Sequence, residues 1–336
     1  MAKVLMKGNE AVGKAAIEAG CRYFFGYPIT PQSEVPEYLS VELPKVGGTF
    51  VQAESEVAAI NMVYGAAAAG ARVLTSSSSP GIALKQEGIG YISNAGLPAV
   101  IINMMRGGPG LGTIQPGQAD YNMTVKGGAN GDYHNVVLAP ASVQEAVNMV
   151  MEAFDIADQY LLPVIILADG LIGQMMEPVE FNYVPRPNLP EKTWALVGHY
   201  GAERSNIKNL VSEPDECEAW NHDHFKVYDE VVKNEQAWEE FKMDDAEYAF
   251  VSYGTASRVV RTAIGYLRAE GYKVGMIRPK TLWPFPQKAF DQFNDKIKSS
   301  WMWKCPWARW FPTLHTLVTT ETRLHSTAEQ AVTYLL

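Results

Sequence analysis

Two hydrophobic periods alternate along residues 8–170. Short continuous apolar runs predict buried strands at 21–25, 49–52, 73–75, 98–104, 135–139 and 163–168. Apolar residues spaced three or four positions apart predict helices at 9–19, 33–43, 55–69, about 82–93 and 142–160, with Ser33 as one N-cap. Continuous apolar strands separated by helices are typical of a parallel sheet covered on both faces. We therefore expect a doubly wound α/β domain whose ligands bind at the carboxyl ends of the strands.

This alternation stops at residues 171–245. Residues 177–190 contain four prolines and predict an extended arm, whereas the acidic stretch 213–247 predicts a helix from about 224 to 241. A second α/β unit follows, with strands at 248–252 and 272–277, a turn at 254–257 and a helix at 258–270. The chain thus predicts a large domain, a linker and a smaller domain.

Composition limits the possible functions. The chain has 336 residues, 47% of them hydrophobic and 19% charged, which is typical of an ordered protein with room for two domains. A net charge of −9 argues against nucleic acid as a partner. The N-terminus has no secretory pattern and no 18-residue apolar run occurs, so no membrane association is expected. Three scattered cysteines, Cys21, Cys217 and Cys305, exclude a self-contained metal or iron–sulfur site and favour a reducing cytoplasm.

Glu54 and Glu56 are the candidate catalytic carboxylates. They stand at the start of the apolar, alanine-rich helix predicted at 55–69. A carboxylate there either stabilises the helix N-terminus on the surface or enters a buried pocket and performs chemistry. Two residues differ by about 200° around a helix, so we expect only one of the pair to enter the pocket. Spacing favours Glu56.

Other candidate residues follow predicted strands. Arg106 comes after the strand 98–104, where a guanidinium suits a bidentate grip on a carboxylate, although a surface arginine would follow the same pattern. Thr30 lies in a loop stiffened by Pro28 and Pro31. Its hydroxyl either hydrogen-bonds a bound molecule or is an ordinary polar group of a turn. The serines at 76–79 either line a pocket or cap the next helix. The glycines at 108, 110 and 112 lack the spacing of a dinucleotide loop.

Several motifs, in this order, resemble the α subunits of 2-oxoacid:ferredoxin oxidoreductases, and most of all the branched-chain (2-oxoisovalerate) group. They are 27–31 (Tyr-Pro-Ile-Thr-Pro), 54–59 (Glu-Ser-Glu-Val-Ala-Ala), 76–81, 106–110 (Arg-Gly-Gly-Pro-Gly), 131–134, 168–170 and, in the second unit, 278–286. The resemblance covers about residues 1–298. It implies a pyrimidine-binding domain at 1–173, an arm and acidic linker at 174–245 and a smaller transketolase-C-terminal-like domain at 246–298.

The resemblance also implies a cofactor and residue roles. The family uses thiamine diphosphate, whose C2 carbon must lose a proton, and a buried carboxylate bonded to N1′ of the aminopyrimidine promotes that loss. Glu56 matches the family's activating glutamate, Thr30 the threonine that hydrogen-bonds substrate, and Arg106 would hold the 2-oxoacid carboxylate. The other residues expected to bind the cofactor are Tyr27, Pro28, Ile29, Ser79 and Gly81.

The sequence lacks the Gly-Asp-Gly motif that anchors the diphosphate through Mg²⁺ in thiamine enzymes; residues 131–133 are the nearest approach. The resemblance therefore implies that this chain binds no metal, and that a β subunit supplies the diphosphate site, Mg²⁺ and a [4Fe-4S] cluster. It further implies γ and ferredoxin-like subunits, ferredoxin as electron acceptor, coenzyme A as substrate, and anaerobic branched-chain amino acid catabolism. Alone, the chain is expected to be inactive.

The tail departs from the family after Lys298. Four tryptophans fall within residues 301–310, and no clear periodicity appears before about residue 327. Restoring one nucleotide near Lys298 gives a reading frame that resembles the normal family C-terminus, so we expect a frameshift at about Ser299 that leaves the second domain incomplete. Alternative functions are the same reaction on 2-oxoglutarate or pyruvate, and a non-catalytic scaffold subunit; a flavodoxin-like or nicotinamide-binding module is disfavoured.

Overall fold

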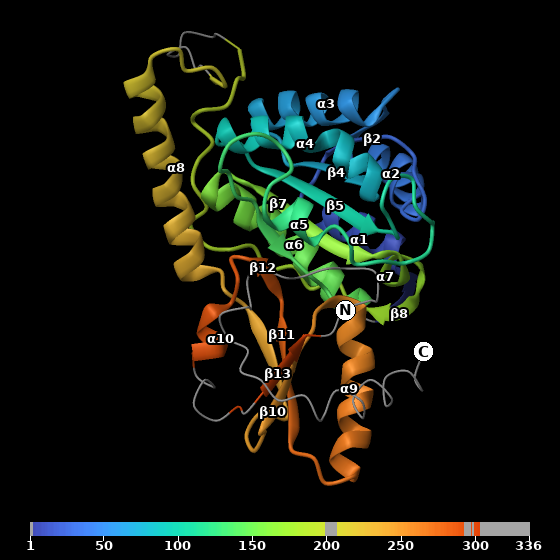
Figure 1. Cartoon of the computed structure of the whole chain (residues 1–336). Coiled ribbons are helices and arrows are strands. Elements are labelled where there is room, and N and C mark those ends of the chain that lie inside the picture. The colour runs from blue at the N-terminus through green and yellow to red at the C-terminus, as the bar shows by residue number, and fades with distance from the viewer. Residues whose placement is uncertain (1–2, 199–206, 292–296, 298, 303–336) are drawn as a thin grey trace.

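The computed structural model describes residues 3–198, 207–291, 297 and 299–302, which form two α/β units (Figure 1). The larger unit contains a seven-stranded sheet in the order β12-β6-β7-β5-β4-β2-β3, in which every pair is parallel except β12 with β6. Its strands are β2 (Tyr23–Gly26), β3 (Thr49–Gln52), β4 (Val73–Ser77), β5 (Ala99–Met105), β6 (Val136–Leu138), β7 (Pro163–Asp169) and β12 (Thr281–Trp283). The predicted fold class is confirmed.

Helices cover both faces of this sheet. One face packs against α1 (Gly8–Glu18), α2 (Glu34–Lys45) and α6 (Val143–Tyr160), and the other against α3 (Glu56–Ala68), α4 (Ser79–Asn94) and α5 (Tyr121–Val125). The central strands β5 and β7 are buried along their whole length, which explains their continuous apolar sequences. Since parallel strands end at one edge, the segments after β2, β4, β5 and β7 meet there.

The smaller unit has a four-stranded sheet in the order β13-β10-β11-β9. Its elements are β9 (Trp238–Phe241), β10 (Tyr248–Val251), α9 (Gly254–Ala269), β11 (Val274–Pro279), α10 (Gln287–Asp291) and β13 (Ser299–Met302). Two features differ from the prediction. Residues 254–257 form the first turn of α9 rather than a separate turn, and β9, which pairs antiparallel with β11, comes from the stretch predicted to be linker. The expected domain boundaries stay a prediction.

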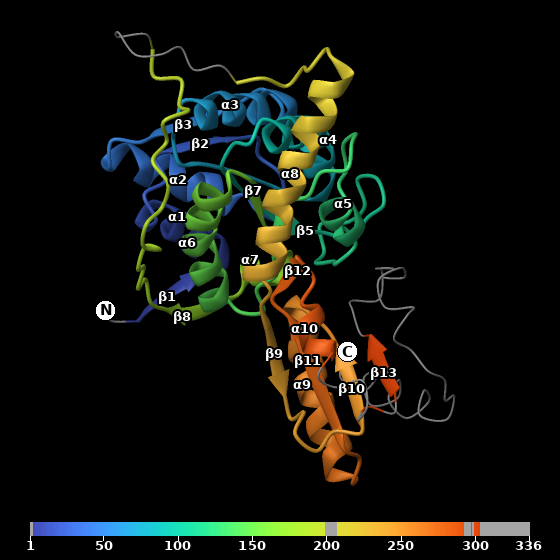
Figure 2. The same ribbon diagram turned by 90° about the vertical axis from the view of Figure 1, so that its left-hand side faces the viewer.

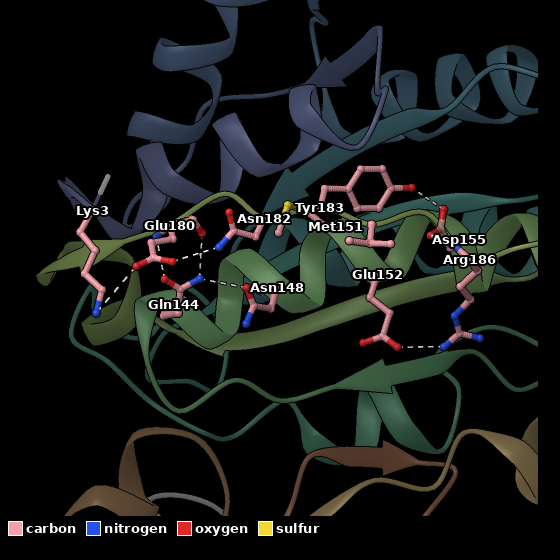
Figure 3. A pocket seen from close by; sticks show the side chains of 11 residues that line it. Lys3, Gln144, Asn148, Met151, Glu152, Asp155, Glu180, Asn182, Tyr183 and Arg186 are labelled. Carbon is pink, nitrogen blue, oxygen red and sulfur yellow. Dashed lines mark hydrogen bonds and ion pairs between the residues drawn. The ribbon is translucent and has the colours of Figure 1, made fainter. Parts of the chain in front are cut away.

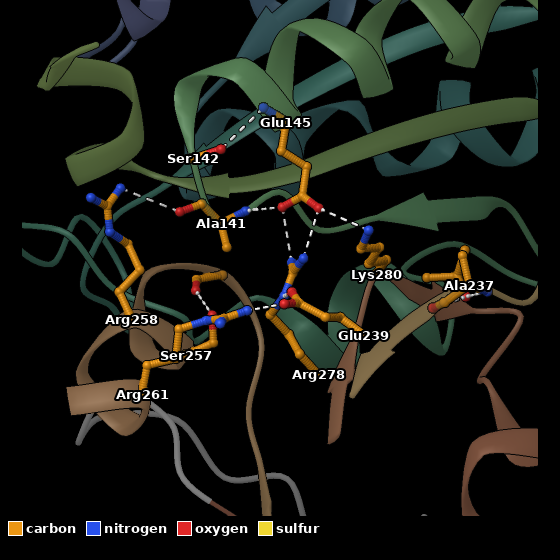
Figure 4. A network of polar contacts seen from close by, with 12 residues as sticks. Ala141, Ser142, Glu145, Ala237, Glu239, Ser257, Arg258, Arg261, Arg278 and Lys280 are labelled. Carbon is orange, nitrogen blue, oxygen red and sulfur yellow. Dashed lines mark hydrogen bonds and ion pairs between the residues drawn. The ribbon is translucent and has the colours of Figure 1, made fainter. Parts of the chain in front are cut away.

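A buried arginine joins the two units (Figure 4). Arg278 on β11 donates to both carboxylate oxygens of Glu145 on α6, at 2.7 and 2.9 Å, and to Glu239 on β9 at 2.8 Å. Its side chain is 5% exposed. Immediately beyond it, β12 leaves the smaller unit and pairs with β6 of the larger one. A bidentate buried contact and a shared strand therefore fix one unit on the other.

The linker is more ordered than its sequence predicts. The expected arm begins as β8 (Met176–Val179), paired antiparallel with β1 (Val4–Lys7). The helix expected at 224–241 is wrong in both bounds: α8 spans Pro214–Asn234 alongside the larger unit (Figure 2) and buries Tyr228 and Val231. Proline at its first position is a start signal that the periodicity did not reveal. Within the described ranges, no helix is long and apolar enough to cross a membrane.

Serine side chains cap two helices at residues that were not predicted as caps. Ser55 and Ser142 accept hydrogen bonds from Ala58 N and Glu145 N, both at 3.1 Å, and so cap α3 and α6. Ser33 precedes α2 with helical backbone angles and no side-chain capping bond, so the cap predicted there is wrong. Residues 303–336 lie outside the described part of the chain, and with them the prediction of an altered reading frame; the first four residues after Lys298 form β13.

Candidate active site

Glu56 is the carboxylate that enters the interior. The chain leaves the end of β3 at Gln52, Ser55 caps α3, and Glu56 is the first helical residue. Its side chain is 7% exposed, whereas Glu54, two residues earlier, is exposed. Glu54 lies before the N-cap Ser55, whose backbone is extended, so the start of α3 separates the two acids. Among the described residues, no hydrogen bond reaches the Glu56 carboxylate, so it is available to a ligand.

The Glu56 carboxylate packs against Gly81. A Cβ built on Gly81 would lie 2.8 Å from Glu56 Oε1 and 2.2 Å from Ser77 Oγ. A side chain at residue 81 would force both oxygens to move, because real Cβ contacts essentially never fall below 3.0 Å. Gly81 belongs to the first turn of α4, so Glu56 lies at the N-terminal ends of both α3 and α4.

None of the serines at 76–79 makes a side-chain capping bond to α4 in the described structure, and whether they line a cofactor pocket stays a prediction. Ser78 holds the N-cap position of α4 without a side-chain capping bond. Ser76 Oγ donates to Gln32 Oε1 at 2.5 Å, and Ser79 Oγ donates to Asp120 Oδ2 at 2.5 Å. Among the described residues, the buried hydroxyls of Ser77 and Ser78 have no partner. Buried polar groups without a partner are costly, so such hydroxyls mark a place where a polar ligand would be stabilised.

Arg106 is buried, which excludes the surface alternative. Its guanidinium is directed at two loops: Nη1 donates to Thr30 O and Nη2 to Leu111 O, both at 2.9 Å. The side chain is 8% exposed, and its Nε has no hydrogen-bond partner among the described residues. Arg106 therefore joins the loop after β2 to the glycine-rich loop after β5. It also retains a free, buried N–H that suits an anionic oxygen.

The loop that carries Thr30 faces outward. Tyr27, Pro28 and Thr30 are exposed, and Ile29 is half-buried. Thr30 contacts Arg106 through its carbonyl rather than through its hydroxyl. The structure thus brings these residues close to Arg106 without enclosing them, and their expected roles remain predictions.

Two charged side chains belong to this edge although they were not predicted: Lys85 is buried and Asp120 is half-buried. Lys85 lies on α4, one turn after Gly81, and is completely buried. Its sequence position was informative, because it occupies the apolar stripe formed by Ile82 and Ile89. Asp120 lies in a loop and accepts hydrogen bonds from Ser79 and from Asn103 Nδ2 (2.9 Å). Burial raises the pKa of Asp120. The sequence around Asp120 gives no signal of its contact with Ser79.

A separate pocket lies on the outer side of α6 and β8 (Figure 3). Its polar side chains pair with one another: Arg186 bonds Glu152 at 2.9 Å, and Gln144 bonds Glu180 through backbone contacts. It shares no residue with the Glu56 site. Because its polar groups are satisfied, we interpret it as the anchor of the arm. Within the described ranges, no cluster of three or more histidine, cysteine or acidic residues is arranged to hold a metal ion.

Two family models match the chain. Residues 14–211 match "Pyruvate flavodoxin/ferredoxin oxidoreductase, thiamine diP-bdg", and residues 246–303 match "Pyruvate:ferredoxin oxidoreductase core domain II". The chain is 51% identical over 299 residues to the ketoisovalerate oxidoreductase subunit VorB of Methanothermobacter thermautotrophicus, covering 88% of this chain and 84% of that one. It is 36% identical over 319 residues to the 2-oxoglutarate synthase subunit KorA of Methanocaldococcus jannaschii, covering 88% and 85%.

A solved structure shows the same fold. The 2-oxoglutarate:ferredoxin oxidoreductase from Magnetococcus marinus, solved with 2-oxoglutarate, coenzyme A and succinyl-CoA bound, is 29% identical and superposes with a TM-score of 0.78. The match covers 89% of this chain but 57% of the solved one, so this chain spans just over half of that protein.

Proposed function

Because the chain belongs to the pyruvate flavodoxin/ferredoxin oxidoreductase family, we propose that it supplies the aminopyrimidine half of a thiamine diphosphate site. The enzyme would oxidatively decarboxylate a branched-chain 2-oxoacid such as 2-oxoisovalerate to an acyl-CoA and CO₂, and pass the electrons to ferredoxin. The observation that carries the proposal is the buried Glu56 carboxylate seated on Gly81 at the carboxyl edge of the sheet.

The residues at this edge fit an aminopyrimidine. Such a ring offers a nitrogen that pairs with a carboxyl group and an amino group that needs an acceptor. Glu56 supplies the carboxylate, and the unpartnered hydroxyls of Ser77 and Ser78 supply further polar partners. The missing side chain of Gly81 lets the carboxylate approach the backbone of α4. We expect Tyr27, Pro28, Ile29 and Ser79 to complete the cofactor surface.

Each residue would have a separate task. Bound thiamine diphosphate supplies a nucleophilic carbon and an electron sink for decarboxylation. Glu56 would hold a proton at N1′ of the pyrimidine. Arg106 would bind the 2-oxoacid carboxylate, using its free Nε and exchanging its bond to Leu111 O. The Thr30 hydroxyl would hydrogen-bond the substrate from the opposite loop.

The surface beside Glu56 supports the need for partner subunits. Helix α3 is mostly apolar, yet Val57 and Met62 on it are 46% and 37% exposed, and Leu84 on neighbouring α4 is 55% exposed. A helix of mostly hydrophobic residues is normally buried. We propose that a β subunit covers α3 and α4 and brings the diphosphate site, Mg²⁺ and a [4Fe-4S] cluster, with γ and ferredoxin-like subunits completing a cytoplasmic, anaerobic complex.

Two observations support a branched-chain 2-oxoacid as the substrate. The relative named for ketoisovalerate is 51% identical, compared with 36% for the relative named for 2-oxoglutarate. Near Arg106 the side chains of Met104, Met105 and Leu111 are apolar, which suits a branched alkyl chain better than a second carboxylate. The alternatives remain 2-oxoglutarate or pyruvate as substrate, and a non-catalytic scaffold role. The proposed domains are 1–173 and 246–298, connected by 174–245.

The test is anaerobic co-expression with the partner subunits, followed by coenzyme A-dependent reduction of a low-potential dye. We expect kcat/KM for 2-oxoisovalerate to exceed that for 2-oxoglutarate and pyruvate by at least about tenfold, since discrimination by one apolar pocket is worth that much. A preference for 2-oxoglutarate would overturn the substrate assignment. No 2-oxoacid-dependent reduction by an assembled, cofactor-loaded complex would favour the scaffold role.

A further inference from the structure

The half-buried carboxylate of Asp120 is linked by hydrogen bonds to the backbone of Arg106. Its Oδ2 accepts from Ser79 Oγ at 2.5 Å and from Asn103 Nδ2 at 2.9 Å. Ser79 Oγ in turn accepts from the Arg106 backbone N–H at 3.0 Å. Asp120, Ser79 and the Arg106 backbone therefore form a continuous chain of hydrogen bonds. It runs from a loop, through the first residue of α4, to the residue that follows β5.

Asp120 determines the direction of the Ser79 hydroxyl proton. This hydroxyl has one proton and two possible acceptors, Asp120 Oδ2 at 2.5 Å and Arg106 O at 3.3 Å. The much shorter contact takes the proton, because hydrogen bonds weaken with distance. A lone pair of Ser79 Oγ is then left to accept the Arg106 N–H. Asp120 Oδ2 accepts whether or not Oδ1 carries a proton, so an acceptor oxygen at this point is what the arrangement requires.

The loop between Arg106 and Asp120 also contacts the guanidinium group. Before substrate binds, Leu111 O accepts from Arg106 Nη2 at 2.9 Å. The loop folds back on its own start, where Gly107 N donates to Gln115 O at 2.9 Å. Asp120 is the residue at which this loop is bonded to β5 and α4 again. Its carboxylate therefore holds the loop as well as the backbone from which the arginine side chain extends.

We propose that Asp120 is a positioning residue for the 2-oxoacid substrate, and that it acts on Arg106 through Ser79. This role rests on the proposed function, in which Arg106 binds the substrate carboxylate. The buried Nε of Arg106 has no hydrogen-bond partner among the described residues, and a guanidinium holds a carboxylate well only in a restricted geometry. Without the Asp120 acceptor, the charge of Arg106 remains but its direction is no longer fixed.

The first measurement is the kinetics of the assembled complex with 2-oxoisovalerate. Asp120→Leu keeps a similar side-chain size and removes the acceptor, whereas Asp120→Asn keeps one acceptor oxygen. We expect KM to rise at least about tenfold in Asp120→Leu and to stay within about threefold of wild type in Asp120→Asn. In both variants kcat and the hydrogen–deuterium exchange rate at C2 of bound thiamine diphosphate should stay within about threefold of wild type, since neither depends on the grip on the substrate carboxylate.

The second measurement reads the position of Arg106 without turnover. Backbone amide exchange is followed by mass spectrometry with fragmentation to single residues. We expect the Arg106 amide, which donates to Ser79 Oγ, to exchange at least about tenfold faster in Asp120→Leu. The Ile101 amide in the same strand should be unchanged and reports any general loosening. Asp155→Asn, which alters a buried carboxylate on α6, is the control and should change neither KM nor exchange at Arg106.

Ser79→Ala removes the link itself and provides a second variant. It should accelerate exchange at Arg106 as much as Asp120→Leu does, and the double variant should be no faster, because residues that act as a unit are not additive. Unchanged exchange at Arg106 in folded Asp120→Leu, or an unchanged KM, overturns the role of Asp120. An equal loss of C2 exchange overturns it too. If the wild-type, cofactor-loaded complex turns over no 2-oxoacid, the proposed function fails, whatever the exchange at Arg106.

Discussion

Replacing Gly81 with alanine tests the geometry of the site by adding one methyl group. The new Cβ would lie 2.8 Å from Glu56 Oε1, so the oxygen must retreat by about 0.6 Å to reach ordinary contact at 3.4 Å. Ser77 Oγ, at 2.2 Å, must move farther still. Overpacking of this kind costs about 1–3 kcal/mol of unfolding free energy. Since a misplacement of about 1 Å can cost a hundredfold in rate, we expect Gly81→Ala to lower kcat by about 10- to 100-fold.

The assay is coenzyme A-dependent dye reduction by the complex, together with thermal unfolding, and two glycines provide matched controls. Gly88→Ala on the same helix would place its Cβ 2.5 Å from Ile60 Cγ2, so we expect a similar loss of stability with nearly normal turnover. Gly265→Ala on α9 meets nothing within 4 Å and should gain up to about 1 kcal/mol in unfolding free energy. Equal losses of turnover in Gly81→Ala and Gly88→Ala, or none in either, would refute the reasoning.

Three further changes test the surrounding structure. Arg278→Met leaves the partly buried Glu145 without its bidentate partner and should lower the free energy of unfolding by about 2–4 kcal/mol in urea denaturation; an unchanged midpoint would contradict the proposed anchoring of the two units. Ser55→Ala removes the cap of α3 and should cost about 1 kcal/mol, with Ser55→Asp close to wild type; equal losses in both would argue against capping. Burial raises the pKa of Cys21 to about 12, so a thiol reagent at pH 8 should label exposed Cys217 and spare Cys21, as mass spectrometry of the peptides would show; rapid labelling of Cys21 in the folded protein would contradict its burial.

Much of the larger unit could be predicted because its signals are local. Strand β3 begins and ends at the predicted residues, since an apolar run between a glycine pair and a polar helix start defines both ends. Only one of the two acids was expected to be buried, and it is Glu56, which opens α3 while Glu54 precedes its N-cap. Arg106 was placed correctly after β5, although its two backbone partners depend on loops far apart in sequence.

The features that escaped prediction depend on distant partners. The short strands β9 and β12 are defined by pairing with β11 and β6, and neither segment has a distinct periodicity of its own. Asp120 approaches Ser79 only when the loop folds back over the sheet edge. Lys85 is different, because the sequence places it on the apolar stripe of a predicted helix. Its burial could have been predicted from that position alone.

The most direct test of the central claim compares Glu56→Gln with Glu54→Gln in the assembled complex. The measurement is the rate of hydrogen–deuterium exchange at C2 of bound thiamine diphosphate, read by NMR after acid quench. A carboxylate that shares a proton with the pyrimidine should be worth about 10²- to 10⁴-fold, so exchange should collapse in Glu56→Gln and stay within about threefold of wild type in Glu54→Gln. Wild-type exchange in a folded, cofactor-loaded Glu56→Gln complex would contradict the account.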